Sequence, residues 1–90
     1  MEIIRCASAG TMESSDAYVE IEPYEKGIKF SLESVVSKQF GDEISSAVMD
    51  VLSQNGVANA EIRVRDRGAL ECVIRARVET AVLRAGEENK

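Results

Sequence analysis

The stretch AYVEIEPYEKGIKFSLE, residues 17–33, decides the fold class of this chain. Apolar and polar side chains alternate along 17–22 and again along 28–33, which is the period of a strand with one buried face. Pro23 follows the first run and cannot donate a hydrogen bond to a neighbouring strand, so the first strand ends there. The stretch therefore predicts two half-buried strands, joined by a turn that ends at Gly27.

A third strand is predicted on the N-terminal side of this stretch. Residues 3–12 are rich in apolar side chains, with Gly10 as a site for a bend. The polar residues 13–16, Glu-Ser-Ser-Asp, then favour a turn, because Ser and Asp side chains hydrogen-bond to nearby backbone groups. The segment is predicted to be a β-hairpin with Ser14 near its tip, and the three N-terminal strands are predicted to form an antiparallel meander.

The second half of the chain changes to the three- and four-residue spacing of amphipathic helices. One helix is predicted from about Ser34 to a stop at Asn55 and Gly56, where either residue suits a helix C-terminus. A second helix is predicted over 69–85, and alternation over 60–65 predicts a strand between the two. The expected buried residues are Val36, Phe40, Ile44, Ala47, Val48, Val51 and Leu52 in the first helix, and Leu70, Val73, Ile74, Val78, Ala81, Val82 and Ala85 in the second.

The order of these elements, β-β-β-α-β-α, predicts an α+β fold. Two helices on one face of a mostly antiparallel four-stranded sheet make a two-layer sandwich. At 90 residues the chain is the size of one domain, which we expect over 1–86. The polar residues 87–90 are expected to be a frayed tail.

Composition excludes several classes of function. The net charge is −5, and an acidic domain binds nucleic-acid phosphates poorly, so no nucleic-acid partner is expected. There is no His, and Cys6 and Cys72 are far apart, so neither a metal site nor a Cys–His nucleophile is expected. Both cysteines are predicted to be free thiols buried in the core. With neither a signal-peptide pattern nor an apolar run long enough to cross a membrane, the chain is expected to be cytoplasmic, without a membrane partner.

No catalytic motif is present in the chain. A serine nucleophile needs a base, and without His the usual one is missing, so we expect no active site carried by this chain alone. Ser14 is still the candidate functional residue, because a modifying enzyme can reach a hydroxyl at the tip of a turn. From the residues alone, turn formation without any function is the simpler interpretation of Ser-Ser-Asp.

Residues 9–16, AGTMESSD, resemble the Ala-Gly-Thr-Leu-Glu-Ser-(Gly/Ser)-Asp signature of citrate lyase acyl carrier proteins, the gamma subunits of that complex. Three more stretches resemble the same family in the same order, at residues 38–42, 66–70 and 74–77. Met12 stands where the family usually has Leu, a change between side chains of similar volume. The resemblance covers nearly the whole chain.

This resemblance implies a carrier subunit that does not itself catalyse the reaction. The signature serine of the family, which corresponds to Ser14, carries a 2'-(5''-triphosphoribosyl)-3'-dephospho-coenzyme A arm through a phosphodiester. The thiol of the arm holds acetyl and then citryl as a thioester, while the alpha and beta subunits exchange the acyl group and cleave citryl to oxaloacetate. A prosthetic-group transferase is the further partner that the resemblance implies.

Two alternatives stay open. The carrier subunit of malonate decarboxylase resembles this family and holds the same type of arm, although Glu13 and the Ala-Gly-Thr start of the signature favour citrate lyase. The other alternative is a small α+β interaction module without any prosthetic group, which composition alone favours.

Arg77 is the second candidate site residue. By helical angle it lies in the apolar arc of the second helix, between Val73 and Leu70. A charged side chain there must form an ion pair, extend outward to solvent, or face a partner. An internal salt bridge or an extended side chain is the simpler interpretation. Contact with a large subunit, or with phosphates of the arm, is the functional one.

Overall fold

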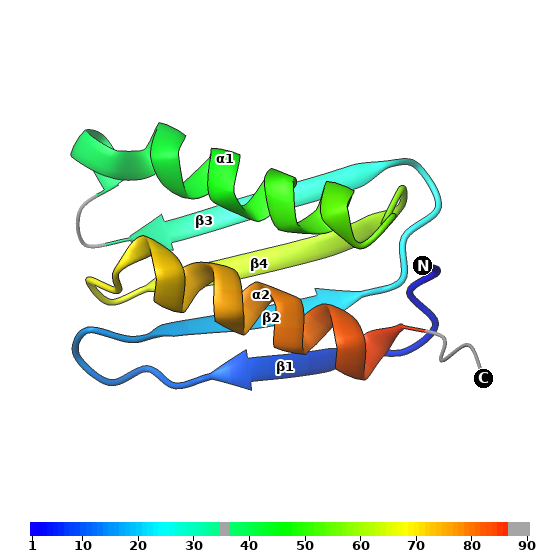
Figure 1. Cartoon of the computed structure of the whole chain (residues 1–90), viewed down its shortest axis with the longest axis horizontal. Coiled ribbons are helices and arrows are strands. Elements are labelled where there is room, and N and C mark those ends of the chain that lie inside the picture. The colour runs from blue at the N-terminus through cyan, green and yellow to red at the C-terminus, as the bar shows by residue number, and fades with distance from the viewer. Residues whose placement is uncertain (35–36, 87–90) are drawn as a thin grey trace.

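Two layers make up the computed structural model, which describes residues 1–34 and 37–86 (Figure 1). Its elements are β1 (Ala7–Gly10), β2 (Ala17–Glu22), β3 (Ile28–Ser34), α1 (Ser37–Gln54), β4 (Ala60–Asp66) and α2 (Glu71–Ala85). The four strands form one sheet, and both helices lie on the same face of it (Figure 1). The predicted α+β class and element order are confirmed. The predicted tail, residues 87–90, lies outside the described residues.

The strands are ordered β1-β2-β4-β3 in the sheet, so the predicted antiparallel meander of the first three strands is wrong. β4 lies between β2 and β3, antiparallel to β2 and parallel to β3. Its inward residues Ala60, Ile62 and Val64 are at most 1% exposed, which suits a strand at the centre of the sheet. Because β3 and β4 are parallel, a crossover must connect them, and α1 is that crossover.

β1 is shorter than the strand predicted over 3–12. Only 4 residues of that segment form β1, and they pair with β2 in the register that sets Gly10 opposite Tyr18. Ile3 forms an isolated antiparallel bridge with Gly86 instead, just beyond α2. The predicted β1–β2 hairpin is confirmed, and the residues before it run alongside the end of α2.

The hydrophobic core fills the space between the sheet and the two helices. The inward side chains Val19 and Ile21 of β2 are at most 1% exposed, as their alternation predicts. The helices bury Ile44, Ala47, Val48, Val51 and Leu52 in α1, and Ile74, Val78, Ala81, Val82 and Ala85 in α2. Full burial of one aliphatic side chain of this kind contributes about 1.5–3 kcal/mol relative to exposure. Of the other predicted core positions, Val36 and the side chain of Phe40 lie outside the described residues.

The buried face of α2 is narrower than predicted. Leu70 is 71% exposed, because it precedes the helix as an extended N-cap residue and not as part of the first turn. Val73 is only half-buried, because by helical angle it lies on the side of α2 opposite the buried residues Ile74 and Val78. Cys6 and Cys72 are free thiols as predicted, but both are exposed, so their predicted burial is wrong. Cys6 precedes the sheet, and Cys72 lies on the solvent side of α2.

Asp66 is the one buried charged side chain among residues 1–34 and 41–86, with 1% of its surface exposed. Its carboxylate accepts hydrogen bonds from the Ser34 hydroxyl at 2.7 Å and from the backbone N–H groups of Gly68 and Ala69 at 3.1 and 2.8 Å. Burying a carboxylate is costly unless donors of this kind surround it. Asp66 therefore ties the end of β3 to the loop between β4 and α2.

Replacing Asp66 by Ala leaves these donors without their acceptor in a buried site. We expect Asp66→Ala to lower the free energy of unfolding by about 2–4 kcal/mol, as measured by urea denaturation. Asp50→Ala is the control, because Asp50 pairs with Arg75 at the surface, with 48% of its side chain exposed. Exposed pairs contribute at most about 1 kcal/mol, so equal losses in the two variants would contradict the role given to Asp66.

Candidate functional site

Ser14 lies at the tip of the β1–β2 hairpin. Residues 13–16 form a β-turn, in which the Asp16 N–H donates to the Glu13 carbonyl oxygen at 3.2 Å. Ser14 is exposed at the second position of this turn, and no group among the described residues hydrogen-bonds to its hydroxyl. The hydroxyl is therefore accessible to another enzyme.

The backbone that follows Ser14 is held against the loop between β4 and α2. The Ser15 N–H donates to the Arg67 carbonyl oxygen at 2.8 Å, and the Arg67 N–H donates to the Asp16 carbonyl oxygen at 2.9 Å. Ser15 has a φ of +67°, in the left-handed region that glycine adopts most easily. This backbone angle gives a physical reason why Gly is the alternative to Ser at the corresponding position of the family signature.

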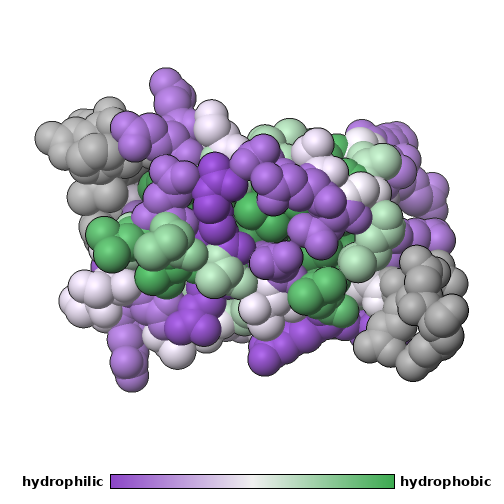
Figure 2. Space-filling model, viewed as in Figure 1, coloured by the Kyte–Doolittle hydropathy of each residue, from purple (hydrophilic) through white to green (hydrophobic). Residues whose placement is uncertain are grey.

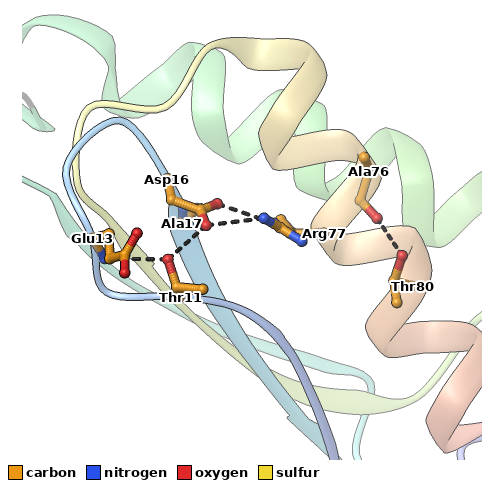
Figure 3. A network of polar contacts seen from close by, with 7 residues as sticks. All are labelled: Thr11, Glu13, Asp16, Ala17, Ala76, Arg77 and Thr80. Carbon is orange, nitrogen blue, oxygen red and sulfur yellow. Dashed lines mark hydrogen bonds and ion pairs between the residues drawn. The ribbon is translucent and has the colours of Figure 1, made fainter.

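The Asp16 carboxylate is the centre of the polar network behind the turn (Figure 3). Arg77, from α2, donates to it through Nε at 3.0 Å and Nη2 at 2.9 Å, so the pair is bidentate. The Thr11 hydroxyl and the Ala17 N–H each add a hydrogen bond of 2.7 Å. Thr11 also accepts from the Glu13 N–H at 3.2 Å, which extends the network to the other side of Ser14.

These donors make Asp16 a strongly acidic carboxyl. The hydrogen bond from Arg77 is the largest cause, followed by those from Thr11 and the Ala17 N–H, and together they lower the pKa of Asp16 from 3.8 to about 2. Only 14% of the side chain is exposed, so the carboxylate lies below the surface beside the turn. It is therefore ionised and fully engaged at neutral pH.

Gly10 gives Arg77 the space to reach this carboxylate. Its φ is +94°, and a Cβ atom built on it would lie 1.8 Å from the Ala17 carbonyl oxygen and 3.2 Å from Cδ of Arg77. Only glycine avoids the first contact and adopts this backbone without strain. The signature therefore needs glycine at position 10, because the end of β1 approaches β2 and α2 too closely for a side chain.

Of the two predicted site residues, Ser14 is presented to solvent and Arg77 is bound within the chain. The ion pair of Arg77 with Asp16 is an internal salt bridge, which is the simpler of the two interpretations of Arg77 given above. Covalent attachment at Ser14, and contact of Arg77 with phosphates or a partner, stay predictions. Sequence reasoning missed Asp16 and Gly10 as the residues that position the turn, although both lie in the signature.

A cavity of about 310 Å³ lies on the other side of the loop between β4 and α2. Its lining consists of Glu43, Ile44, Asp66, Gly68, Ala69, Leu70, Glu71 and Ile74. Three of these residues are acidic, so the cavity disfavours phosphate and carboxylate groups. In the described part of the chain, no group of three or more His, Cys, Asp or Glu could hold a metal ion. None of the helices described is both long and apolar enough to span a bilayer.

The residues at the turn fit the phosphodiester-linked arm that the resemblance implies. A phosphodiester on serine needs an accessible hydroxyl, which Ser14 provides. The Asp16 carboxylate behind the turn is paired with the Arg77 guanidinium, which reduces its repulsion of a phosphate (Figure 3). Arg67 is exposed, and its backbone is hydrogen-bonded to the turn at Ser15 and Asp16.

Comparison with known proteins finds relatives that match nearly the whole chain. A family model described as "Malonate decarboxylase delta subunit (MdcD)", with the short name ACP, matches residues 4–85. The citrate lyase acyl carrier protein of Escherichia fergusonii is 50% identical over 91 residues, which cover 100% of this chain and 94% of that protein. The protein of the same name in Haemophilus influenzae is 44% identical, over 98% of this chain and 92% of the relative.

A solved structure has the same fold. In a crystal structure of a Pseudomonas malonate decarboxylase hetero-tetramer in complex with malonate, one chain matches with a TM-score of 0.67. The match covers 93% of this chain and 87% of that chain, at 24% sequence identity. At that identity the likeness shows the fold alone.

The low pKa of Asp16 predicts how the stability of the turn depends on pH. Because the folded pKa of about 2 lies below the unfolded value of 3.8, the contribution of Asp16 is present above about pH 4 and is lost as the pH falls toward 2. Asp16→Asn removes this contribution at every pH. We therefore expect the difference in unfolding free energy between wild type and Asp16→Asn to narrow below about pH 4, in urea titrations. A difference that stays constant over that range would contradict the assignment.

Proposed function

The chain belongs to the family of citrate lyase acyl carrier proteins, and from this premise we propose that it holds a covalent prosthetic arm on Ser14. Members of the family are acyl carriers and not catalysts, which makes this chain a carrier subunit of citrate lyase. The arm that we propose comes from 2'-(5''-triphosphoribosyl)-3'-dephospho-coenzyme A. The Ser14 oxygen bonds to the phosphorus next to the ribose and pyrophosphate leaves, so that a phosphodiester joins the arm to the chain.

The observation that supports Ser14 is the contrast between its free hydroxyl and its fixed backbone. No group among the described residues binds the hydroxyl, while hydrogen bonds from Ser15 and Asp16 hold the main chain directly after it. A carrier needs both properties. The hydroxyl must be reached by a transferase, and the base of the arm must then stay in one orientation relative to the partner subunits.

The chain prepares its serine but does not activate it. Asp16 is a poor general base, because its pKa is about 2 and its oxygens already accept hydrogen bonds. The proton of the Ser14 hydroxyl therefore goes to a base on the prosthetic-group transferase. When bound, the arm supplies a thiol that carries the acyl group as a thioester, and tethering holds that thioester at a high effective concentration near the catalytic subunits.

Citrate lyase is the better supported of the two related complexes. The citrate lyase acyl carrier proteins are 50% and 44% identical over almost the whole chain, while the chain from the malonate decarboxylase structure is 24% identical. The partners we propose are the alpha and beta subunits of citrate lyase, together with the transferase. The free cysteines agree with a reducing cytoplasm.

Intact-mass spectrometry of the chain from its native complex tests the attachment site. We expect wild type to carry the added mass of the arm and Ser14→Ala to have the mass of the bare chain, because the substitution removes the oxygen to which the arm is proposed to be joined. Ser15→Gly is the matched control, since glycine adopts the positive φ of this residue and leaves the turn in place. It should carry the arm as wild type does.

Two results would count against the proposal. Added mass on Ser14→Ala would place the arm on another residue. A bare wild-type chain in the native complex would favour an interaction module without a prosthetic group.

A comparison of Arg77→Ala with Asp16→Asn tests what Arg77 does. If Arg77 acts only by holding Asp16, the two variants should slow attachment of the arm by a similar factor, of about 3- to 10-fold, because each frees the turn. If Arg77 also contacts the phosphates or a large subunit, Arg77→Ala should slow attachment or weaken assembly more than Asp16→Asn. Unchanged attachment and assembly in Arg77→Ala would contradict both roles.

A further inference from the structure

α2 has uncharged residues on its solvent side as well as on its buried side. Directly opposite the buried face, within an arc of about 100°, lie Cys72, Val73, Ala76, Thr80 and Leu83, which we call the outer stripe. Cys72, Ala76 and Leu83 are exposed, and Leu83 has 52% of its surface accessible. The Thr80 hydroxyl already donates to the Ala76 carbonyl oxygen at 2.9 Å within the helix (Figure 3). The stripe therefore offers a partner almost no polar group that must be desolvated.

The open side of the sheet and the outward side of α1 both carry charged residues. On the open side of the sheet, Arg63 forms ion pairs with Glu20, Glu22 and Glu61 at 3.6, 2.9 and 3.3 Å. The outward side of α1 carries exposed carboxylates such as Asp50. Figure 2 shows hydrophobic patches near both ends of α2, with hydrophilic residues between them, while hydrophilic residues cover most of α1. Removing charged surfaces from water is costly, so α2 has the face best suited to a lasting contact.

The outer stripe lies beside the machinery that positions Ser14. Arg77 borders the stripe on the same helix, and it is the residue that binds the Asp16 carboxylate of the turn. A partner seated on the stripe would therefore hold the helix to which the serine turn is bound. Docking through α2 would set the direction in which the Ser14 oxygen points, without covering it.

One end of the stripe is bordered by positive charge. Arg84 donates to the Ser8 carbonyl oxygen at 2.8 Å, and Arg5 donates to the Arg84 and Gly86 carbonyl oxygens at 3.0 and 3.2 Å. Neither guanidinium forms an ion pair with a carboxylate in the described part of the chain. In a chain of net charge −5, this local positive edge is suited to an acidic partner surface.

The comparisons point to another subunit of the complex as the partner for this stripe. Since this family consists of carrier subunits, one face of the chain must contact another subunit.

We infer that the outer stripe of α2 is the surface by which this carrier docks on a large subunit of its complex, with Arg5 and Arg84 meeting acidic side chains there. This inference rests on the proposed function for the nature of the partner. Three observations support it. The outer stripe is uncharged, the open side of the sheet and the outward side of α1 carry charged residues, and the guanidinium groups of Arg5 and Arg84 beside the stripe form no ion pair among the described residues.

Binding of the full-length, unmodified chain to the purified large subunits tests this inference. We expect Ala76→Glu and Leu83→Glu to weaken binding about tenfold or more, because each places a charge in the centre of an apolar contact. Met49→Glu is the matched control, since Met49 is an exposed apolar residue of α1, with 44% of its surface accessible. It should bind within about twofold of wild type. Glu is a good helix former, and circular dichroism of each variant checks that the fold is intact.

Equal affinities of the two stripe variants and the Met49→Glu variant would overturn the inference. A separate variant tests the positive edge formed by Arg5 and Arg84. Arg84→Gln should weaken binding and make the affinity less sensitive to salt, because it removes a charge pair that dissolved ions screen. Unchanged affinity and salt dependence in Arg84→Gln would remove Arg84 from the contact.

Two further measurements separate the possible occupants of the stripe. Loss of arm attachment with normal binding to the large subunits would assign the stripe to the transferase and overturn the inference. A wild-type dimer in sedimentation, abolished by Leu83→Glu without any effect on complex assembly, would assign it to a second copy. Because docking is measured on the unmodified chain, a failure of the Ser14 attachment test remains distinguishable from a failure here.

Discussion

The bidentate ion pair between Arg77 and Asp16 is the interaction on which presentation of Ser14 depends. It connects α2 to a four-residue polar turn over a separation of 61 residues in the chain. A hairpin joined by such a turn has little stability by itself, and its loop samples many conformations. The guanidinium removes that freedom, because the carboxylate that it binds also holds Thr11 and the N–H of Ala17. Fixing one side chain thus orders both sides of the serine.

The topology of the sheet makes this contact possible. Because β4 lies beside β2, the loop that follows β4 ends next to the β1–β2 turn, where Arg67 exchanges backbone hydrogen bonds with Ser15 and Asp16. Asp66 holds the same loop from within, through Gly68 and Ala69. α2 begins directly after this loop and carries Arg77 over the turn. The meander that the sequence predicted would have left the turn without the neighbouring loop.

The structure separates the tasks of a carrier among different surfaces. The serine hydroxyl is exposed to solvent, while the Asp16 carboxylate behind it is paired with Arg77 and the backbone that follows it is held by hydrogen bonds. The outward side of α2 carries an uncharged stripe and takes no part in the turn. With the arm on Ser14 and docking through the outer stripe, as proposed above, the docking contact and the reacting group do not compete for the same residues.

The sequence alone determined the local features of this protein. Alternation identified the inward faces of β2, β3 and β4, Asn55 and Gly56 marked the end of α1, and the polar run before Ala17 predicted an exposed turn with Ser14. These predictions succeed because periodicity and turn chemistry depend on neighbouring residues. Only the tertiary structure decided which strand lies beside which, where the buried arc of α2 ends, and that Asp16 is the partner of Arg77. Such pairings join distant segments, and the packing of the whole sheet and both helices selects them, so no local pattern can reveal them.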